Sequence, residues 1–505
     1  MEANERNEAR GYPPVEFREQ VTQTPPEAAD PAAAYNKAAE ACFRRGNYGQ
    51  ALAWLLQVLS VREKTLGWEH PNTAVTCNNI ALACHRQGKN TQAMEWFQKA
   101  LAIFEKVLGQ EHQSTVTTCN NIAGVCHSLG EFEQAWAWSM KALAVCEGTL
   151  GREHPETATA YNNIAGICTS RGDYHQALEW LLKAVAIREK ALGKEHLFTA
   201  ATYNNIALVY NSQGNFALAM EWYEKALAVN EKVLGQGHPD TATTYNNIAG
   251  VYDCLGEYAQ ALEWYTKAIN ALEKALGKEH PDTATAYSNV AVALSHQADY
   301  VQAAEWHLKA LSVREKSLGA EHPDTAATYH SIAGVYNNLG DYRQAMEWYL
   351  KAIAVREKAT GKERLPAAYT YNCIAIIFYR QGDYQQSLDW YHKALTIREE
   401  ELGPEHPDTA ITYNNIAGVY NDQGDHAQAL AWFEKALSSL EQTNGREHPL
   451  TAITCNNIAL LYSRQGKHTQ AMEYYERALK VFEREFGHQH PYTVKVMENM
   501  RNIFN

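Results

Sequence analysis

The chain has 505 residues, of which 46% are hydrophobic and 20% are charged, and its formal net charge is −13. This acidic balance argues against broad binding to nucleic acids or to anionic membranes, because both attract cationic proteins. No stretch approaches the ~18 uninterrupted apolar residues of a membrane-spanning helix. We therefore expect a globular protein that has neither nucleic-acid nor membrane partners.

The first 31 residues differ from the rest of the chain in composition. They contain five prolines, seven acidic residues and three arginines. They lack the apolar centre of a secretory signal, so we expect a cytoplasmic protein. We interpret residues 1–31 as a flexible acidic tail that docks into the ligand groove described below and competes with partners there.

A single repeat fills the remainder of the sequence. The motif Asn-Asn-Ile-Ala begins at Asn78, Asn120, Asn162, Asn204, Asn246, Asn414 and Asn456, and every difference between these positions is a multiple of 42. A fixed period of this length is typical of stacked structural repeats. Twelve phases fit without insertion or deletion, so we expect one repeat array rather than several unrelated domains.

Each repeat has the pattern of a helical hairpin, as residues 239–277 illustrate. An apolar stripe at helical spacing predicts a first helix and comprises Tyr245, Ile248, Ala249 and Tyr252. Gly256 is expected to end this helix, and a second amphipathic helix follows until Gly277. A single hairpin leaves its apolar faces uncovered, so stacking of neighbouring repeats must bury them.

The order and spacing of these residues resemble the tetratricopeptide signature, with Ala261 and Tyr265 in the second helix. Glu273 replaces the usual proline, so the second helix continues for about two more turns. The longer unit resembles the repeats of kinesin light chains. The resemblance implies an all-α fold, a right-handed superhelical solenoid of antiparallel helix pairs. Eleven repeats would occupy residues 32–487, and a C-terminal capping helix residues 488–505.

The resemblance also implies that the first helices line a concave groove. The second asparagine of each pair would then form a row along the groove floor: Asn79, Asn121, Asn163, Asn205, Asn247, Asn289, Asn415 and Asn457. In similar arrays such asparagines bind the backbone of an extended peptide, and an amide suits this because it both donates and accepts. Alternatively, both asparagines form ladders between repeats. We favour the ladder for the first asparagine and ligand contact for the second.

Charged residues at the groove-facing positions indicate the chemistry of the ligand. Six are positive, namely Lys37, Arg44, Arg86, Arg380, Arg464 and Lys495, and two are negative, Glu40 and Asp422. The excess of positive charge predicts an acidic peptide or protein partner.

Three recurring features are expected to have structural roles. A histidine precedes most first helices, but repeats ~8–10 Å apart cannot share one metal whose ligands lie ~2 Å away, so we expect no metal site. A repeated tryptophan in the second helix is interpreted as stacking core. The ten cysteines lack a C-x-x-C pair and are interpreted as reduced, mostly buried thiols.

The sequence contains no nucleophile–base arrangement and no phosphate-binding loop, so we expect neither an enzyme nor a bound cofactor. We predict a protein–protein interaction scaffold or adaptor whose groove binds an extended, acidic peptide or a partner domain. One alternative is a regulatory sensor whose superhelix changes pitch on binding a small peptide or metabolite. Another is a non-catalytic subunit of an enzyme complex.

Overall fold

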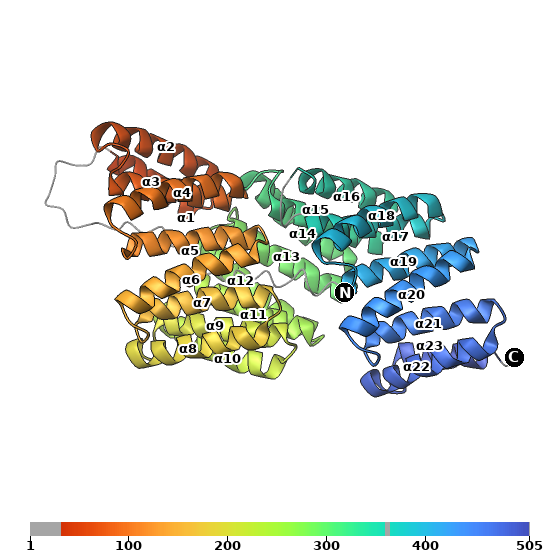
Figure 1. The fold of residues 1–505 in the computed structure, drawn as a ribbon. Helices are drawn as coiled ribbons and strands as arrows, with labels where there is room; N and C mark the ends of the chain where they lie inside the picture. The colour runs from red at the N-terminus through yellow and green to blue at the C-terminus, as the bar shows by residue number, and fades with distance from the viewer. Residues whose placement is uncertain (1–31, 359–363, 504–505) are drawn as a thin grey trace. The chain divides into compact units, whose positions relative to one another are not determined.

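The computed structural model describes residues 32–358 and 364–503, which form 23 α-helices and no β-strand. The acidic tail predicted for residues 1–31 lies outside these described residues. The chain divides into two compact units between Leu339 and Gly340. Helices α1–α15 belong to unit one and α16–α23 to unit two (Figure 1), and each unit is described by itself.

Unit one alternates first and second helices of the repeats. The first helices are α1 (Ala33–Arg44), α3 (Pro71–Arg86), α5 (Gln113–Ser128), α7 (Pro155–Ser170), α9 (Leu197–Ser212), α11 (Pro239–Cys254), α13 (Pro281–His296) and α15 (Pro323–Asn338). The second helices are α2 (Tyr48–Thr65), α4 (Asn90–Val107), α6 (Phe132–Thr149), α8 (Tyr174–Leu192), α10 (Phe216–Val233), α12 (Tyr258–Ala275) and α14 (Tyr300–Ser317).

Unit two continues the same alternation. It contains α16 (Tyr342–Arg356), α17 (Arg364–Arg380), α18 (Tyr384–Glu401), α19 (Pro407–Gln423), α20 (His426–Thr443), α21 (Pro449–Arg464), α22 (His468–Phe486) and α23 (Pro491–Arg501). The last helix, α23, packs on α22. Within both units the helix pairs confirm the predicted all-α solenoid of repeats.

The helices begin and end where the sequence supplies caps. At the start of α11 the ring Nδ1 of His238 accepts a hydrogen bond from the backbone N–H of Asp240 (3.1 Å), and Pro239 occupies the first turn. The turn between α11 and α12 contains Gly256 at φ +78°, a backbone conformation that disfavours residues with a Cβ. Capping and turn chemistry therefore fix the 42-residue hairpin.

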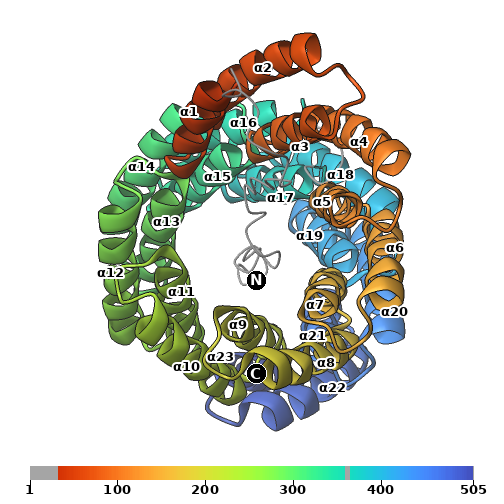
Figure 2. The ribbon, with the colours of Figure 1, turned by 90° about the vertical axis from the view of Figure 1, so that its left-hand side faces the viewer.

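The core of each hairpin lies between its two helices and continues into the next repeat. In α11 and α12, Tyr245, Ala249, Ala261 and Tyr265 are buried, and the alanines let the helix backbones approach closely. In unit one, α5, α7, α9, α11 and α13 form the inner layer, and α6, α8, α10, α12 and α14 the outer layer (Figure 2). Consecutive inner helices contact each other directly. No helix within the described residues combines the length and apolarity needed to cross a membrane.

Candidate functional site

The paired asparagines of the inner helices form a ladder between repeats. The Nδ2 of the second asparagine donates to the Oδ1 of the first asparagine one repeat earlier. These bonds are Asn121 to Asn78 (3.2 Å), Asn205 to Asn162 (3.1 Å), Asn247 to Asn204 (3.1 Å), Asn289 to Asn246 (2.9 Å) and Asn415 to Asn372 (3.2 Å). The ladder predicted for the first asparagine is confirmed. The second asparagine, expected to face a ligand, also takes part because consecutive inner helices touch.

Burial varies along the row of second asparagines. Asn79, Asn121 and Asn163 are buried, whereas Asn205, Asn247, Asn289, Asn415 and Asn457 are half-buried. A buried side chain presents little surface to a ligand. The half-buried members retain accessible polar atoms, because one hydrogen bond uses only part of the amide's capacity. Ligand contact by the row is therefore most feasible from Asn205 onward.

One hollow on the inner helices of unit two gathers several predicted residues. It has a volume of about 310 Å³ and is lined, among others, by Asn415, Asn457 and Arg464 from the predicted site. Gly418 also lines the hollow, and a Cβ built on it would meet no atom within 4 Å. The missing side chain leaves room for a ligand backbone to approach the helix. Arg380, although predicted for the same groove, is not among the lining residues.

The charged groups of this hollow are already paired with one another. Tyr379 donates its phenolic hydrogen to Oδ2 of Asp422, and Arg464 Nη1 donates to Oδ1 of the same carboxylate at 3.0 Å. Partial burial raises the pKa of Asp422, but the bonds from Tyr379 and Arg464 outweigh it and hold the pKa below its usual value. Burial and Asp422 raise the pKa of Tyr379 to about 12. At neutral pH the hollow thus holds a carboxylate, a guanidinium and a neutral phenol.

This arrangement also leaves unsatisfied hydrogen-bond acceptors beside the hollow. Within the described residues, Oδ1 of Asn414 and Oδ1 of Asn421 are buried and have no hydrogen-bond partner. Both asparagines line the hollow. The equivalent oxygens of Asn120, Asn456 and Asn337 also lack a partner, so this feature recurs along the array. Beside the hollow, an amide that turns toward a ligand N–H would gain a hydrogen bond.

Ion pairs also modify the predicted positive charge of the groove. Glu40 pairs with Arg44 at 3.5 Å, just as Asp422 pairs with Arg464, so both predicted groove acids neutralise a neighbouring groove cation. Lys37 and Arg380 are exposed, and Arg86 is half-buried. The excess of positive charge consequently rests on fewer residues than the sequence count suggested.

The histidines that precede most first helices act as helix caps. Ten of these histidines accept a backbone N–H at Nδ1: His70, His112, His154, His196, His238, His280, His322, His406, His448 and His490. The predicted loop role is confirmed. The described residues contain no cluster of three or more side chains suited to hold a metal ion.

The recurring tryptophans of the second helices make packing contacts in the outer layer. Trp264 is half-buried and its ring lies 5.6 Å from the ring of Tyr245, while Nζ of Lys267 lies 3.9 Å from the indole centroid. The same Lys–Trp contact recurs at 3.9 Å between Lys225 and Trp222. A ring covered by core residues on one side and by an ammonium on the other packs and makes a cation–π contact. The predicted structural role of tryptophan is thus consistent with its contacts.

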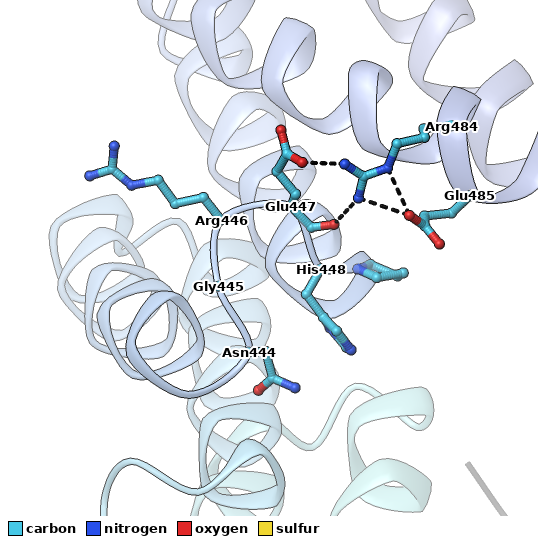
Figure 3. A pocket seen from close by; sticks show the side chains of 8 residues that line it. Asn444, Gly445, Arg446, Glu447, His448, Arg484 and Glu485 are labelled. Carbon is cyan, nitrogen blue, oxygen red and sulfur yellow. Dashed lines mark hydrogen bonds and ion pairs between the residues drawn. The ribbon is translucent and has the colours of Figure 1, made fainter. Parts of the chain in front are cut away.

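A second hollow, with a volume of about 510 Å³, surrounds the loop before α21 and has a structural explanation (Figure 3). Arg484 pairs with the carboxylate of Glu447, donates to its backbone carbonyl at 2.8 Å and contacts Glu485 at 2.8 Å. The same position of the loop pairs with the next repeat elsewhere, as Glu195 does with Lys232 at 2.6 Å. These ion pairs tie consecutive repeats together.

Sequence reasoning missed the polar pairs at the C-terminal ends of the inner helices. Asp253 pairs with His296 at 2.7 Å, and Tyr379 with Asp422, each across 43 residues. The asparagine ladder has the same separation. A search for complementary polar residues one repeat and one position apart would have found both pairs.

Comparison with known proteins identifies the repeat. A family model described as tetratricopeptide repeat matches residues 30–106, 114–190, 156–232, 198–274, 240–316, 282–358, 366–442, 408–484 and 451–500. No curated protein sequence matches the chain significantly.

Several solved structures are similar to parts of the chain. Repeats of a candidate kinesin light chain from Podosopora anserina are 26% identical, with a TM-score of 0.35 over 41% of this chain and 98% of that one. BtubC from P. vanneervenii is 20% identical, with a TM-score of 0.37 over 46% and 91%. Aspartyl phosphate phosphatase F from Bacillus subtilis is 14% identical, with a TM-score of 0.43 over 66% and 96%. These likenesses say nothing about the ligand of this chain.

Proposed function

The chain belongs to the tetratricopeptide-repeat family, and from that premise we propose that it is a non-catalytic scaffold whose inner helices bind an extended segment of a partner protein. Repeats of this family generally mediate protein–protein interaction, and solenoids use their extended concave surfaces for binding. Within the part of the chain that the structure describes, the polar groups named above on the inner helices form no nucleophile–base pair that would favour catalysis.

The observation that carries the proposal is the hollow between α17, α19 and α21. Asn415 and Asn457 offer amide groups, Gly418 leaves space, and Asn414 and Asn421 present buried oxygens that lack partners. An extended peptide has a backbone N–H and C=O at each residue, and side-chain amides match both. We therefore assign this hollow as the subsite that holds the backbone of the bound segment.

Cations on the first helices favour acidic residues in the ligand. In unit two, exposed Arg380 directly follows Tyr379, which lines the hollow, and Arg464 lines it as the partner of Asp422. Unit one carries its own cations on the first helices, at Lys37, Arg44 and Arg86. Charges at the surface attract an acidic peptide weakly and are screened at salt above ~0.15 M. The ligand we propose combines acidic flanks with a neutral, donor-rich centre, and its affinity falls as salt rises.

The cysteines support a cytoplasmic location for this activity. Cys77, Cys119 and Cys455 are buried in the core, and burial raises the pKa of Cys77 to about 12 and that of Cys119 and Cys455 to about 11. Thiols in this state are unreactive hydrophobic residues. A reducing compartment suits a protein whose cysteines have this role.

The proposal can be tested with the full-length chain and an immobilised library of unstructured peptides in three classes with acidic, neutral or basic flanks. We expect selection of acidic-flanked peptides and weaker binding at high salt. Arg380→Glu should reduce that selection, whereas Arg343→Glu makes the same charge change on the outer helix α16 and should not. Selection of basic peptides, or no binding by any class, would contradict the proposed function.

A further inference from the structure

Two hairpin turns of unit one touch loops that lie six repeats later. The turn between α1 and α2 faces the start of α13, so a Cβ built on Gly46 would lie 2.4 Å from Cδ of Pro281 and 3.1 Å from Cδ2 of His280. The turn between α3 and α4 faces the start of α15 in the same way. A Cβ on Gly88 would lie 2.8 Å from Cδ of Pro323 and 3.3 Å from Cδ2 of His322. Only glycine allows these approaches.

Burial at the two contacts differs from that of equivalent residues elsewhere. His280 and His322 are only 5% and 8% exposed, whereas the corresponding His238 and His406 are half-buried. Gly46 is buried, but the corresponding Gly172 is exposed and a Cβ there would meet nothing within 4 Å. The turns of repeats one and two and the helix starts of repeats seven and eight therefore cover each other. The corresponding turn at Gly172 and the corresponding helix start at His238 are more accessible.

The sequence of the two turns is compatible with this neighbour. In seven of the eleven repeats an acidic residue follows the turn position, as in Glu131, Asp173, Glu257 and Asp341. Repeats one and two carry Asn47 and Lys89 there, and the open turns of repeats five and eleven also lack the acid, with Asn215 and Lys467. The loops that repeats one and two approach start helices with Asp282 and Asp324 in the first turn. An acid in the turn would face these carboxylates, and its absence removes the repulsion.

We propose that repeats one and two form a clasp with repeats seven and eight, which holds one superhelical turn of unit one closed and opens on acidification. The clasp comprises Gly46 against His280 and Pro281, and Gly88 against His322 and Pro323. A closed clasp fixes the spacing of the inner helices between its ends, and therefore the spacing of the asparagine row. Opening the clasp lets this superhelical turn change its pitch.

The sensitivity to acid follows from the histidines at the second contact. His322 is bonded to the Arg86 backbone, and the other charged groups near it are Asp324 on its own helix, Arg314 on α14 and His85 on α3. His85 is bonded to Asn90 at 2.8 Å and faces Arg86 and His322. Burial lowers the pKa of both histidines below the ordinary value; Asp324 and the Arg86 backbone oppose this at His322, and Asn90 at His85.

The direction of the pH effect can be worked out from these shifts. A histidine whose pKa is lowered in the closed state is neutral there, and opening lets it bind a proton more readily. The contact is therefore at full strength above the ordinary histidine pKa of about 6.5 and weakens as the pH falls below it. Protonation of both rings would also place two cations beside Arg86.

The test uses small-angle scattering and amide hydrogen exchange on the full-length chain. The clasp variant Gly46→Asn with Gly88→Asn is compared with Gly172→Asn with Gly256→Asn, which have similar positive φ but nothing within 4 Å of an added Cβ. Asparagine tolerates this backbone conformation in both pairs. We expect a larger radius of gyration and exchange roughly tenfold faster at residues 280–284 and 322–326 in the clasp variant only.

A surface substitution gives a second comparison that does not depend on the glycines. Asn47→Asp introduces the acid found in other turns, and Asn215→Asp makes the same change in a turn without a contact. Acidifying the native chain from pH ~7.5 to ~5.5 should likewise enlarge its radius of gyration. The clasp is supported if the glycine variant or the turn-acid variant differs from its control and the native chain also expands in acid. If both pairs match their controls, or the radius is unchanged by acid, the proposal is wrong.

Discussion

Asn247 donates a hydrogen bond from its side-chain amide to the side-chain oxygen of Asn204, 43 residues earlier, at 3.1 Å. This bond explains why two asparagines stand side by side in a helix that disfavours them. At Asn204 and Asn205, and again at Asn246 and Asn247, the first asparagine accepts from the following repeat and the second donates to the preceding one. Each of these two pairs therefore connects its helix to both neighbours and fixes the register of the stack.

A buried threonine in the first helix should stabilise the loop that joins consecutive repeats. Thr241 is fully buried and donates from Oγ1 to the carbonyl of Gly235 at 2.9 Å. Thr241→Val keeps the shape but leaves that carbonyl without its donor, so the free energy of unfolding should fall by about 1–2 kcal/mol. Thr243→Val, on the exposed face of the same helix, should change it by less than about 0.5 kcal/mol. Denaturation in urea measures both, and equal effects would contradict the assigned role.

A buried histidine in α14 should make the protein less stable in acid. His307 is 2% exposed and stands where Tyr265 and Tyr349 occur one repeat before and after. Burial, aided by Arg314, lowers its pKa to about 3. The unfolded chain binds this proton near pH 6.5, so stability is lost as the pH falls below that value, by about 2 kcal/mol at pH ~5.

The variant His307→Tyr should remove this component of the acid sensitivity. Its free energy of unfolding should fall less between pH ~7.5 and ~5 than that of the native chain. Chemical denaturation at both pH values gives the comparison. An identical fall in the two proteins would show that His307 is not the group responsible.

Local structure was predictable from the sequence because it depends on residues close together in the chain. The stripe of Tyr245, Ile248 and Ala249 located α11, and Gly256 located its turn. Partners across repeats were harder to predict, because periodicity shows which face is apolar but not which polar atoms meet. The bond from Tyr245 to Glu231 is one such partner. The clasp depends on small rotations accumulated over six repeats, which no local pattern reveals.

Buried arginines are a second feature that the sequence pattern did not indicate. Arg188 is 4% exposed, and it donates to the carbonyl of Phe198 at 2.8 Å and to the hydroxyl of Thr202 at 2.7 Å. Burial lowers its pKa to about 10, with Glu156 opposing. The equivalent residues Leu272 and Leu440 are apolar.

The comparison among repeats predicts how this site tolerates change. Arg188→Leu should alter the free energy of unfolding by less than about 1.5 kcal/mol, because the polar partners also bond each other and leucine suits this position. Arg188→Ala should cost about 2–5 kcal/mol through the cavity it creates. Thermal and urea unfolding of the two variants measure their free energies of unfolding. A leucine variant as unstable as the alanine variant would mean that the charge itself is required.

The central claim, that the hollow in unit two binds an extended peptide, is tested most directly by two substitutions at the ends of one hydrogen bond. Asn415→Ala and Asn372→Ala each remove the 3.2 Å bond between these residues, but only Asn415 lines the hollow. Calorimetric titration with the tightest peptide from the library should show affinity about tenfold weaker for Asn415→Ala, or about 1.4 kcal/mol, and native affinity for Asn372→Ala. Equal affinities for the two variants would mean that the asparagines only stabilise the stack, and the account of the groove would be wrong.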